Sequence, residues 1–378
     1  MKEESRARLP GGFEASQARY EGWLSRYMPL DARALGEKRR LMAVDPFKFL
    51  RATFFRWAEL WHDVAGEDER QATPILAVGD LHVENFGTWR DADGRLIWGI
   101  NDFDEVTTLP WTQDLVRLAT SAYLAIDARR LDIGRRTASA AILDGYTSGL
   151  TSGGCPFVLE ERHGWLRALA LGAERDPARF WARLLALPTV KLRDARVQRL
   201  LAAAWPVRAL PFRVALRTAG LGSRGRPRFV ALAEHHGGHV AREAKALAPS
   251  AWCLGRPGVP SSSGSRSEAR IRYAELLSSA VRVPDPCVRV ESGWIVRRLG
   301  PHCSGIDLTE LGTRRDARRL LFAMGFETAN IHLGAPPARL KQIARELRRL
   351  PADWLHDAAK TFARVVTEDW RAWVARRR

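Results

Sequence analysis

The sequence predicts an α+β protein with two lobes, a small antiparallel β lobe and a larger helical lobe. Two observations lead to this fold class. Apolar residues recur at helical spacing over most of the chain, whereas residues 205–300 contain short apolar runs that alternate with glycine-rich turns. The chain also has 378 residues, a length that suits about two domains. We therefore expect residues 1–204 and 301–378 to build the helical lobe and residues 205–300 to build the β lobe.

The composition is that of a globular, basic protein. Hydrophobic residues make up 46% of the chain, and 60 Lys and Arg against 43 Asp and Glu give a formal net charge of +17. Such a charge attracts polyanions, including nucleic acid. The excess is mostly Arg and is spread along the sequence, so solvated helix faces explain it better than a nucleic-acid interface does.

The cysteines and the apolar runs indicate the compartment. The four cysteines lie far apart without a C-x-x-C pair, which argues against a disulfide framework or a zinc site and favours a reducing compartment. The first residues lack the apolar core of a signal peptide. No run approaches the roughly 18 apolar residues that a membrane span needs. We therefore expect a cytoplasmic protein that does not enter a membrane.

A helix is predicted to begin at Asp45, which can cap it, with Pro46 at the first helical position. Its aromatic and aliphatic residues recur at helical spacing and favour a buried face. These residues are Phe47, Leu50, Phe54 and Trp57. Arg51 on the same segment could reach a phosphate, although core packing explains the segment better.

Residues 78–104 contain the densest group of polar side chains. Two apolar runs, Ile75–Val78 and Leu96–Ile100, each end in a polar cluster, and Asp91–Gly94 between them has the composition of a hairpin turn. We expect two short β segments whose ends bring the polar side chains together. These side chains are Asp80, His82, Asn85, Asp102 and Asp104.

This group predicts a cation site. Neighbouring carboxylates repel one another unless a cation lies among them, and oxygen ligands suit Mg²⁺. Four residues separate Asp80 from Asn85, as in the protein-kinase catalytic loop, where Asp orients the attacking hydroxyl and Asn binds a metal. Asp102-Phe103-Asp104 then falls where kinases carry Asp-Phe-Gly. The alternative is a Gly-Asp turn and an acidic hairpin end that are solvated and inert.

A further helix is predicted from Pro110, with Asp114 in its first turn, where a carboxylate interacts favourably with the helix dipole. In phosphotransferases a similar Asp braces the catalytic loop, and we expect a structural role here. Residues 135–204 are rich in Ala, Leu and Arg and are expected to form helices of the same lobe.

The β lobe is predicted to contain a glycine-rich loop. Three strands are expected, at about 212–219, 227–234 and 239–246. The first turn, Gly220–Gly225, is a G-x-G-x-x-G, but Pro227 argues against the helix that a dinucleotide-binding fold requires after it. Strand, glycine-rich turn and strand is the arrangement with which kinases cover ATP phosphates, and Lys245 lies on the third strand, where kinases place their phosphate-binding Lys. The alternative is an ordinary β-meander with a basic edge.

The segments after Lys245 would complete both lobes. Gly255–Ser267 has the composition of a flexible linker, and a helix is expected from about Glu268 to Val281. Glu275 on this helix is the expected ion-pair partner of Lys245, with Glu268 as the next candidate and surface solvation as the alternative for either residue. The remaining predictions are a hairpin at 288–290 and 294–299 and helices at 316–332, 338–349 and 352–377.

The order of these segments resembles a circular permutation of the protein-kinase-like fold, because the catalytic and metal Asp residues precede the glycine-rich loop and Lys. The G-D-L-H motif resembles the corresponding motif of aminoglycoside and choline phosphotransferases. The order, with G-D-L-H-V-E-N-F-G, N-D-F-D-E, G-L-G-S-R-G and a later Lys, also resembles the bacterial domain-of-unknown-function family 2252. D-P-F-K-F-L-R near residue 45 and V-T-E-D-W near residue 366 extend that likeness over most of the chain. Val78 departs from the His that usually precedes Gly-Asp in aminoglycoside-type enzymes, and Asp104 departs from the Gly of Asp-Phe-Gly.

The resemblance to kinases implies a kinase-like phosphotransferase that moves a phosphoryl group from Mg-ATP to a hydroxyl-bearing acceptor, either a small molecule or a protein. The implied catalytic residues are Asp80 and His82. The implied Mg²⁺ ligands are Asn85, Asp102 and Asp104. The implied nucleotide-binding residues are Gly220, Gly222, Ser223, Gly225, Lys245 and Glu275.

Three alternatives stay open. Nucleotidyl transfer uses the same residues and differs in the phosphate that is attacked. A non-catalytic nucleotide-binding or nucleic-acid-binding protein would keep the pocket and use the net charge. A metal-dependent phosphoesterase also uses loops similar to G-D-L-H, but that class needs an Asn-His pair, which the sequence lacks.

Overall fold

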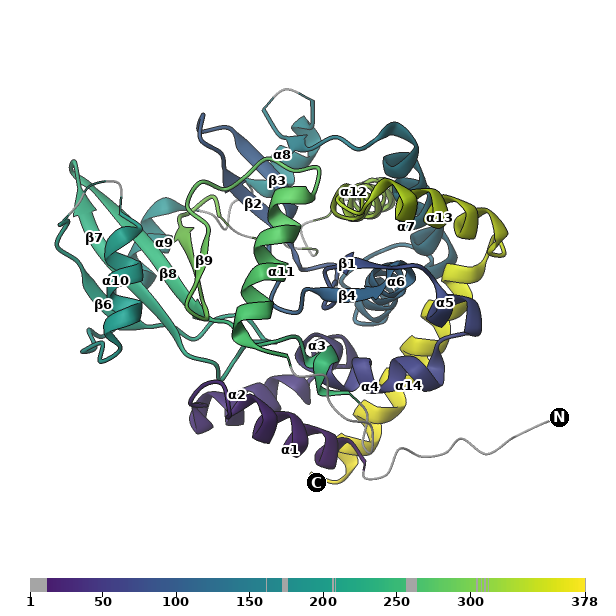
Figure 1. Cartoon of the computed structure of the whole chain (residues 1–378), viewed down its shortest axis with the longest axis horizontal. Helices are drawn as coiled ribbons and strands as arrows, with labels where there is room; N and C mark the ends of the chain where they lie inside the picture. Colours follow the sequence, from purple (N-terminus) through teal and green to yellow (C-terminus); the bar gives the residue numbers. More distant parts are fainter. Residues whose placement is uncertain are drawn as a thin grey trace.

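The computed structural model describes residues 12–160, 162–171, 176–205, 207, 209–255, 264–303, 305–306, 308, 311 and 313–377. Within these residues the protein is a mixed α+β fold with three small antiparallel sheets among many helices. Figure 1 shows the largest sheet at one end of the long axis and most helices at the other. The predicted α+β class is confirmed at this level.

Short helices begin the described chain, and α3 begins with the capping residue and proline that the sequence predicted. Asp45 caps α3, since its side chain accepts a hydrogen bond from the Lys48 N–H at 2.7 Å, and Pro46 is the first helical residue. The predicted helix is interrupted at Thr53, so that it forms two elements. The helices are α1 (Phe13–Leu24), α2 (Ala32–Met42), α3 (Pro46–Ala52), α4 (Phe54–Val64) and α5 (Glu67–Gln71).

Two of the small sheets carry the polar loops of residues 78–104. Their strands are β1 (Pro74–Ala77), β2 (Phe86–Arg90), β3 (Leu96–Ile100), β4 (Thr107–Pro110) and β5 (Phe157–Val158). The turn after Asp91 joins β2 to β3, a hairpin in which Asp91 accepts hydrogen bonds from the Asp93 and Arg95 N–H groups at 3.0 and 2.8 Å. The strand β2 was not predicted, and β1 pairs with β4 instead of lying beside β3.

A bundle of long helices forms the larger part of the core. Its members are α6 (Trp111–Asp127), α7 (Arg135–Ser152), α8 (Gly164–Ala170), α12 (Arg314–His332), α13 (Pro337–Arg349) and α14 (Trp354–Ala375). Helices α7 and α12 pack closely because Gly145 and Gly325 have no side chain. A Cβ at either position would lie 2.0 Å from a backbone oxygen of the other helix. Helix α14 packs on α3 and α6, so the C-terminal helices complete the core that the N-terminal half begins.

The five-stranded sheet has the order β6-β7-β8-β10-β9. The strands are β6 (Arg213–Leu216), β7 (Arg228–His235), β8 (Gly238–Ala246), β9 (Arg289–Glu291) and β10 (Trp294–Leu299). The first three agree with the predicted strands, and β9 and β10 form the predicted hairpin. Residues 177–203 differ from the prediction, because α9 (Pro177–Leu185) and α10 (Ala195–Ala203) pack on this sheet and not with α7. We call this sheet with α9 and α10 the sheet region.

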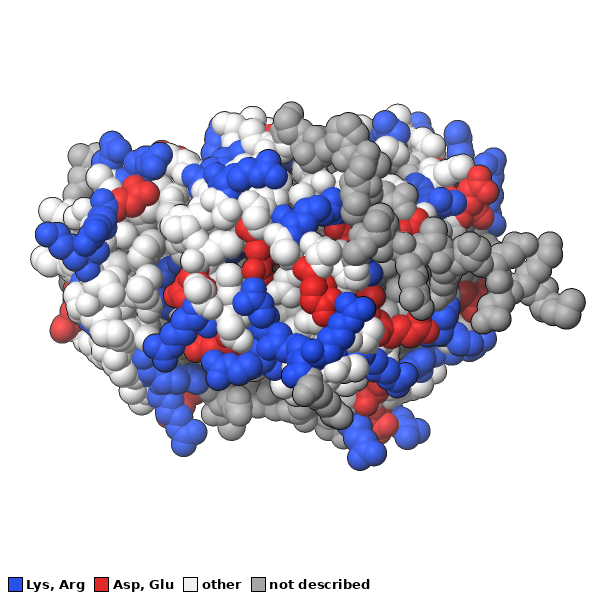
Figure 2. Space-filling view, turned by 90° about the horizontal axis from the view of Figure 1, so that it is seen from below, with Lys and Arg blue, Asp and Glu red and all other residues white. Residues whose placement is uncertain are grey.

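Helix α11 (Arg266–Ser279) lies between the sheet region and the other helices in Figure 1. It follows the short 3-10 helix η2 (Ala251–Leu254), and residues 256–263 of the predicted linker lie outside the described residues. Across the described ranges, no helix is both long enough and apolar enough to span a membrane. On the face shown in Figure 2, Lys and Arg side chains extend across the width of the molecule with Asp and Glu among them.

Candidate functional site

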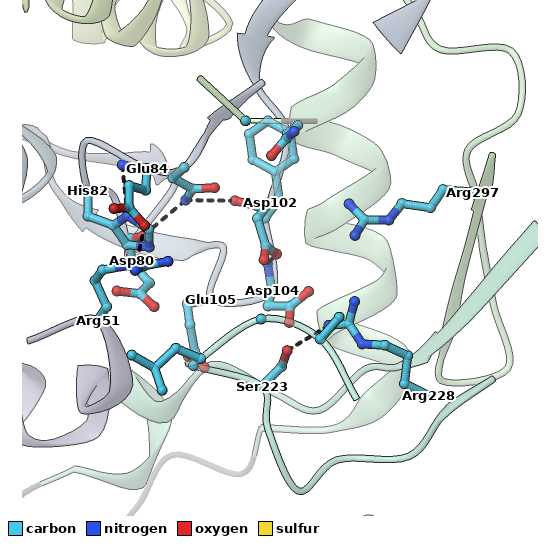
Figure 3. A pocket seen from close by; sticks show the side chains of 18 of the residues that line it. Arg51, Asp80, His82, Glu84, Asp102, Asp104, Glu105, Ser223, Arg228 and Arg297 are labelled. Atoms are coloured by element: carbon cyan, nitrogen blue, oxygen red, sulfur yellow. Dashed lines mark hydrogen bonds and ion pairs between the residues drawn. The ribbon is translucent and has the colours of Figure 1, made fainter. Parts of the chain in front are cut away.

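A cavity of about 340 Å³ lies where the sheet region meets the rest of the protein. Its walls come from the β1–β2, β3–β4 and β6–β7 loops, helix α11 and the end of β10. Figure 3 shows Asp80 and Arg51 on one side, Arg297 on the other, and Asp102 and Asp104 between them. Segments that are more than one hundred residues apart in the chain therefore meet around one space.

The loop that carries Asp80 is fixed by a fully buried carboxylate. Asp114, in the first turn of α6, accepts hydrogen bonds from the Val78 and Gly79 N–H groups at 2.8 and 2.9 Å. The His332 imidazole lies 3.2 Å from Asp114, and the Tyr146 hydroxyl contacts the other imidazole nitrogen at 2.9 Å. This buried chain of polar groups leaves the loop little freedom, which agrees with the structural role expected for Asp114.

Asp80 points into the cavity with one oxygen restrained. Arg117, which is completely buried, donates to Oδ1 from Nε at 2.9 Å and also from its terminal nitrogen. The guanidinium of Arg117 lies over the Phe54 and Trp57 rings at 5.1 and 4.9 Å. Cation–π contact and the ion pair together stabilise a buried charge that would otherwise be costly. Sequence reasoning missed Arg117, because an arginine six residues after a helix start carries no mark of burial.

His82 and Arg51 lie beside Asp80. Burial, with the nearby charges of Arg51 and Arg117, lowers the pKa of His82 well below its ordinary value, so the imidazole is neutral. Its Nδ1 accepts a hydrogen bond from the Glu84 N–H at 3.2 Å, which leaves Nε2 as the protonated nitrogen. Arg51 forms an ion pair with Glu84 at 2.5 Å, and both side chains line the cavity.

Asn85 ties the two acidic loops together. Its Nδ2 donates to the backbone oxygens of Asp80 and Asp102 at 3.1 and 3.2 Å. The Asn85 backbone oxygen also accepts a hydrogen bond from the Asn101 N–H at 3.2 Å. The spacing between Asp80 and Asn85 therefore has a structural consequence, because it places the carboxamide between the ends of the two loops.

Lys245 pairs with the acidic motif of the β3–β4 loop. Its ammonium lies 3.1 and 3.0 Å from the two Asp102 carboxylate oxygens and also forms an ion pair with Asp104. The expected pair with Glu275 is wrong, since Glu275 is exposed on α11 and does not line the cavity. Lys245 is 3% exposed and lies behind the two carboxylates instead of at the cavity wall.

The two carboxylates beside Lys245 have opposite pKa shifts. Desolvation in the cavity opposes ionisation of Asp102, but the charges of Lys245 and Arg297 together with a hydrogen bond from Asp104 outweigh it and lower the pKa of Asp102 below its ordinary value. Burial and the neighbouring Asp102 charge raise the pKa of Asp104. The pair therefore favours one ionised and one readily protonated carboxyl group.

The glycine-rich loop joins β6 to β7 and reaches across the cavity to Asp80. A Cβ at Gly222 would lie 3.1 Å from the Arg51 backbone oxygen and 3.6 Å from Asp80 Oδ2. The backbone at Gly220 is in the left-handed region, with φ of 72°. The Ser223 hydroxyl accepts a hydrogen bond from Arg228 at 2.7 Å. Residues 220–223 thus form one wall of the cavity.

Helix α2 holds the tip of this loop from outside. Lys38 donates to the Gly222 backbone oxygen at 2.7 Å, and the Asp31 N–H donates to the Gly225 oxygen at 3.0 Å. A Cβ at Gly225 would lie 2.5 Å from Leu35. Gly225 is therefore a packing position beneath α2 and not part of the cavity wall.

Glu243 organises the cations on the sheet side, and sequence reasoning missed it. It is completely buried and pairs with Arg228 at 3.0 Å, with Arg297 at 2.9 Å and with Arg217. Burial acts to raise the pKa of Glu243, but the three guanidinium groups hold it well below its ordinary value. The available signal was its position two residues before Lys245, which puts both side chains on one face of β8.

Arg226 is another buried cation, beneath the glycine-rich loop, and sequence reasoning also missed it. It pairs with Glu105 at 3.0 Å and with Asp104 at 3.6 Å, and it donates to the Tyr20 hydroxyl at 2.7 Å. Glu105 in turn accepts a hydrogen bond from the Ala251 N–H at 2.6 Å. These contacts link the N-terminal helices, the acidic loop and the glycine-rich loop.

The acidic loops fit a divalent cation that arrives with phosphate groups. Considering only the residues that the structure describes, no three His, Cys, Asp or Glu side chains form a metal cage. Mg²⁺, however, takes one or two carboxylates and completes its shell with water and phosphate oxygens. Asp104 Oδ1 is buried without a hydrogen-bond partner, and the Asp102 side chain is 43% exposed. The Asn85 hydrogen bonds use Nδ2 and leave Oδ1 as a third ligand atom.

Residues 30–152 match the model of a family described as an uncharacterized protein conserved in bacteria, domain-of-unknown-function family 2252. The match includes the loops with Asp80 and Asp102 but not the glycine-rich loop or Lys245. The resemblance to that family is confirmed over this part of the chain. No curated protein and no solved structure matches the sequence.

Proposed function

We propose that this protein is a kinase-like phosphotransferase that uses Mg-ATP and has the parts of the kinase site in permuted order. One observation carries the proposal. The Asp80–Asn85 loop, the Asp102–Asp104 loop and the glycine-rich loop surround a single cavity, although they are far apart in the sequence. Their spacing and residue types are those of the phosphate- and metal-handling parts of kinases.

The sheet side supplies the charge for nucleotide phosphates. Residues 220–223 bring backbone groups to the cavity, as the kinase glycine-rich loop does. Arg217, Arg228 and Arg297 line the same wall and share one buried carboxylate, Glu243. Three guanidinium groups on one carboxylate leave a surplus of positive charge, which polyphosphate oxygens would neutralise. In this proposal these arginines do much of what a single Lys does in ordinary kinases.

Asn85, Asp102 and Asp104 would hold Mg²⁺, which when bound would neutralise the phosphate charge that develops during transfer. In the structure Lys245 pairs with both carboxyl groups of this set. A ligand that brings its own cation would release the ammonium from Asp102, and the ammonium could then pair with a phosphate from its position on β8.

Asp80 and His82 would handle the acceptor. Arg117 occupies Asp80 Oδ1, so Oδ2 is the oxygen that can accept a hydrogen bond from the acceptor hydroxyl. The neutral His82 can donate from Nε2. Chemistry of this kind depends on positioning and charge neutralisation more than on covalent catalysis.

Calorimetry tests the proposal first. Wild-type protein should bind ATP in a Mg²⁺-dependent manner, and Asp102→Asn should weaken that binding at least about tenfold, which corresponds to about 1.4 kcal/mol. Asp93→Asn is the matched control, because Asp93 is exposed in the β2–β3 turn. Absence of ATP binding by the wild type would overturn the proposal.

A labelling experiment then identifies the reaction. ATP labelled at either the γ- or the α-phosphate is incubated with the protein and a panel of hydroxyl acceptors. Transfer of the γ label, lost in Asp80→Asn and Asp102→Asn, is the expected result. Transfer of the α label alone would mean nucleotidyl transfer. Binding without transfer of either label would indicate a nucleotide-binding protein.

A further inference from the structure

A second cavity, of about 450 Å³, lies on the outside of the helical bundle and shares no lining residue with the first. It is formed by α8, β5 and the N-terminal half of α12. Its walls combine aromatic rings with arginine side chains. The residues that line it are Phe157, His163, Trp165, Arg315, Arg318, Arg319, Phe322 and Ala323. We call this cavity the α8–α12 groove.

Three arginines follow one face of α12 along the groove. Arg318 and Arg319 follow Arg315 by three and four residues, so all three side chains project to the same side of the helix. All three are exposed, and among the residues that the structure describes the one carboxylate paired with them is Asp144, which lies 3.8 Å from Arg318 and is itself 59% exposed. A pair so open to water is weakly held, so this helix face keeps a local excess of positive charge.

The rings of the groove are arranged to receive flat groups. The Arg319 guanidinium lies over the Trp165 ring at 4.4 Å, and the His163 ring lies 4.9 Å from Phe157. Phe322, one turn after Arg318, is 37% exposed and lines the groove. Nucleic-acid bases stack both on aromatic rings and on guanidinium planes. The exposed Phe322 and the Arg319–Trp165 stack provide both kinds of surface.

We propose that the α8–α12 groove binds single-stranded nucleic acid, with the three arginines contacting phosphates and the rings contacting bases. The net charge of +17 favours a polyanion as the ligand. Arg315 and Phe322 are seven residues apart on the helix, about 10 Å along its axis, which suits a few nucleotides of a single strand. A duplex keeps its bases stacked inside and would leave the rings without partners. This inference does not depend on the kinase-like function proposed for the other cavity.

Fluorescence anisotropy with labelled ten-nucleotide oligouridylate and oligothymidylate tests the proposal. Binding should be detectable at 50 mM salt and should weaken about twentyfold at 200 mM, as release of counterions from three phosphates requires. The combined variant Arg315→Gln, Arg318→Gln, Arg319→Gln should lose at least about tenfold in affinity and reduce the slope of log K against log salt by about 2.

The chain offers a matched control. Arg345, Arg348 and Arg349 are exposed on α13 at the same three- and four-residue spacing, but they do not line the groove. Their combined change to Gln removes the same charge and should leave most of the affinity intact. Phe322→Ala keeps every charge and should weaken binding by about fivefold or more through lost stacking. Thermal unfolding of each variant verifies that it is folded.

Three results would overturn the proposal. The first is no binding of either oligonucleotide by the wild type at 50 mM salt. The second is an equal loss of affinity in the α12 and α13 triple variants, which would mean that net charge alone attracts the ligand. The third is equal competition by polyglutamate or by a ten-base-pair duplex, which would point to an acidic protein or to a duplex instead.

Discussion

Two completely or almost completely buried glutamates support the two sides of the first cavity in opposite ways. Glu243 in the sheet region is surrounded by three guanidinium groups, which hold its pKa well below the ordinary value against the effect of burial. Glu327 in α12 is 2% exposed, and within the described part of the chain no guanidinium group forms a hydrogen bond with it. Burial raises the pKa of Glu327 to about 7, although Arg282 lowers it in part. The glutamate on the sheet side is thus fully ionised near pH 7, whereas the glutamate in α12 is about half protonated at that pH.

The difference shows which side of the cavity can exchange partners. Glu327 accepts hydrogen bonds from the Ile100 N–H at 3.2 Å and from the Asn330 amide at 2.8 Å, so it anchors the strand that leads to Asp102. One donor is a backbone N–H and the other is a side-chain amide, and neither Glu327 nor Asn330 lines the cavity, so a ligand that enters does not compete for these bonds. The Glu243 ion pairs hold arginines that line the cavity, and an anionic ligand can compete for them.

The largest expected effect concerns Glu243. Glu243→Gln should lower the free energy of unfolding at pH 7 by about 3–5 kcal/mol, because it leaves three guanidinium groups without a buried counter-charge. Urea denaturation measures the loss. Glu291→Gln, on an exposed position of β9 in the same sheet, should change stability by less than about 0.5 kcal/mol. Equal losses in the two variants would mean that Glu243 is no more important than a surface residue.

The next effect is a pH dependence that Glu327 adds. Its folded-state pKa of about 7 lies above the ordinary value of 4.5, so the folded protein keeps a proton that the unfolded chain releases. The stability it contributes is therefore complete below about pH 4.5 and is lost as the pH rises to about 7, by an amount on the order of 3 kcal/mol.

Urea denaturation at pH 5 and pH 8 measures this contribution as the difference between the wild type and Glu327→Gln. The variant cannot titrate at this position, so its stability should fall less between the two pH values. A parallel fall in both proteins would show that Glu327 is ionised in the folded state.

The smallest expected effect concerns the glycine-rich loop on the sheet side of the cavity. A hydrogen bond from Lys38 in α2 to the Gly222 backbone oxygen holds this loop. Lys38→Met should destabilise the observed conformation of the glycine-rich loop by about 1 kcal/mol, the usual contribution of one hydrogen bond. Amide exchange in residues 220–225 should become about fivefold faster. Arg40→Gln, on an exposed position of the same helix, should leave the exchange rates unchanged. Unchanged exchange in Lys38→Met would mean that other contacts fix the loop.

The local features of the fold could be predicted from the sequence. Asp45 and Pro46 mark a helix start, Gly220 marks a turn with positive φ, and the strands around this turn follow from their apolar runs. These features depend on neighbours within a few residues. The strand β2 was missed because Phe86–Arg90 is short and follows the polar loop directly, and it forms only through pairing with β3.

The polar residues of the candidate site were also found from the sequence, because spacing within one loop reports local geometry. Asp80, His82, Asn85, Asp102 and Asp104 line one cavity as expected. Their partners could not be found in the same way. Lys245 lies 143 residues from Asp102, and Arg226 lies 121 residues from Glu105.

The sequence by itself determined where the helices, strands and turns begin, and which short segments carry the polar groups of the cavity. Only the tertiary structure decided which charges are buried and with which partners, as Glu243, Glu327 and Lys245 show. The physical reason is that capping and turn formation act between neighbours in the chain, whereas the stability of a buried charge depends on surroundings that exist only after distant segments have packed together.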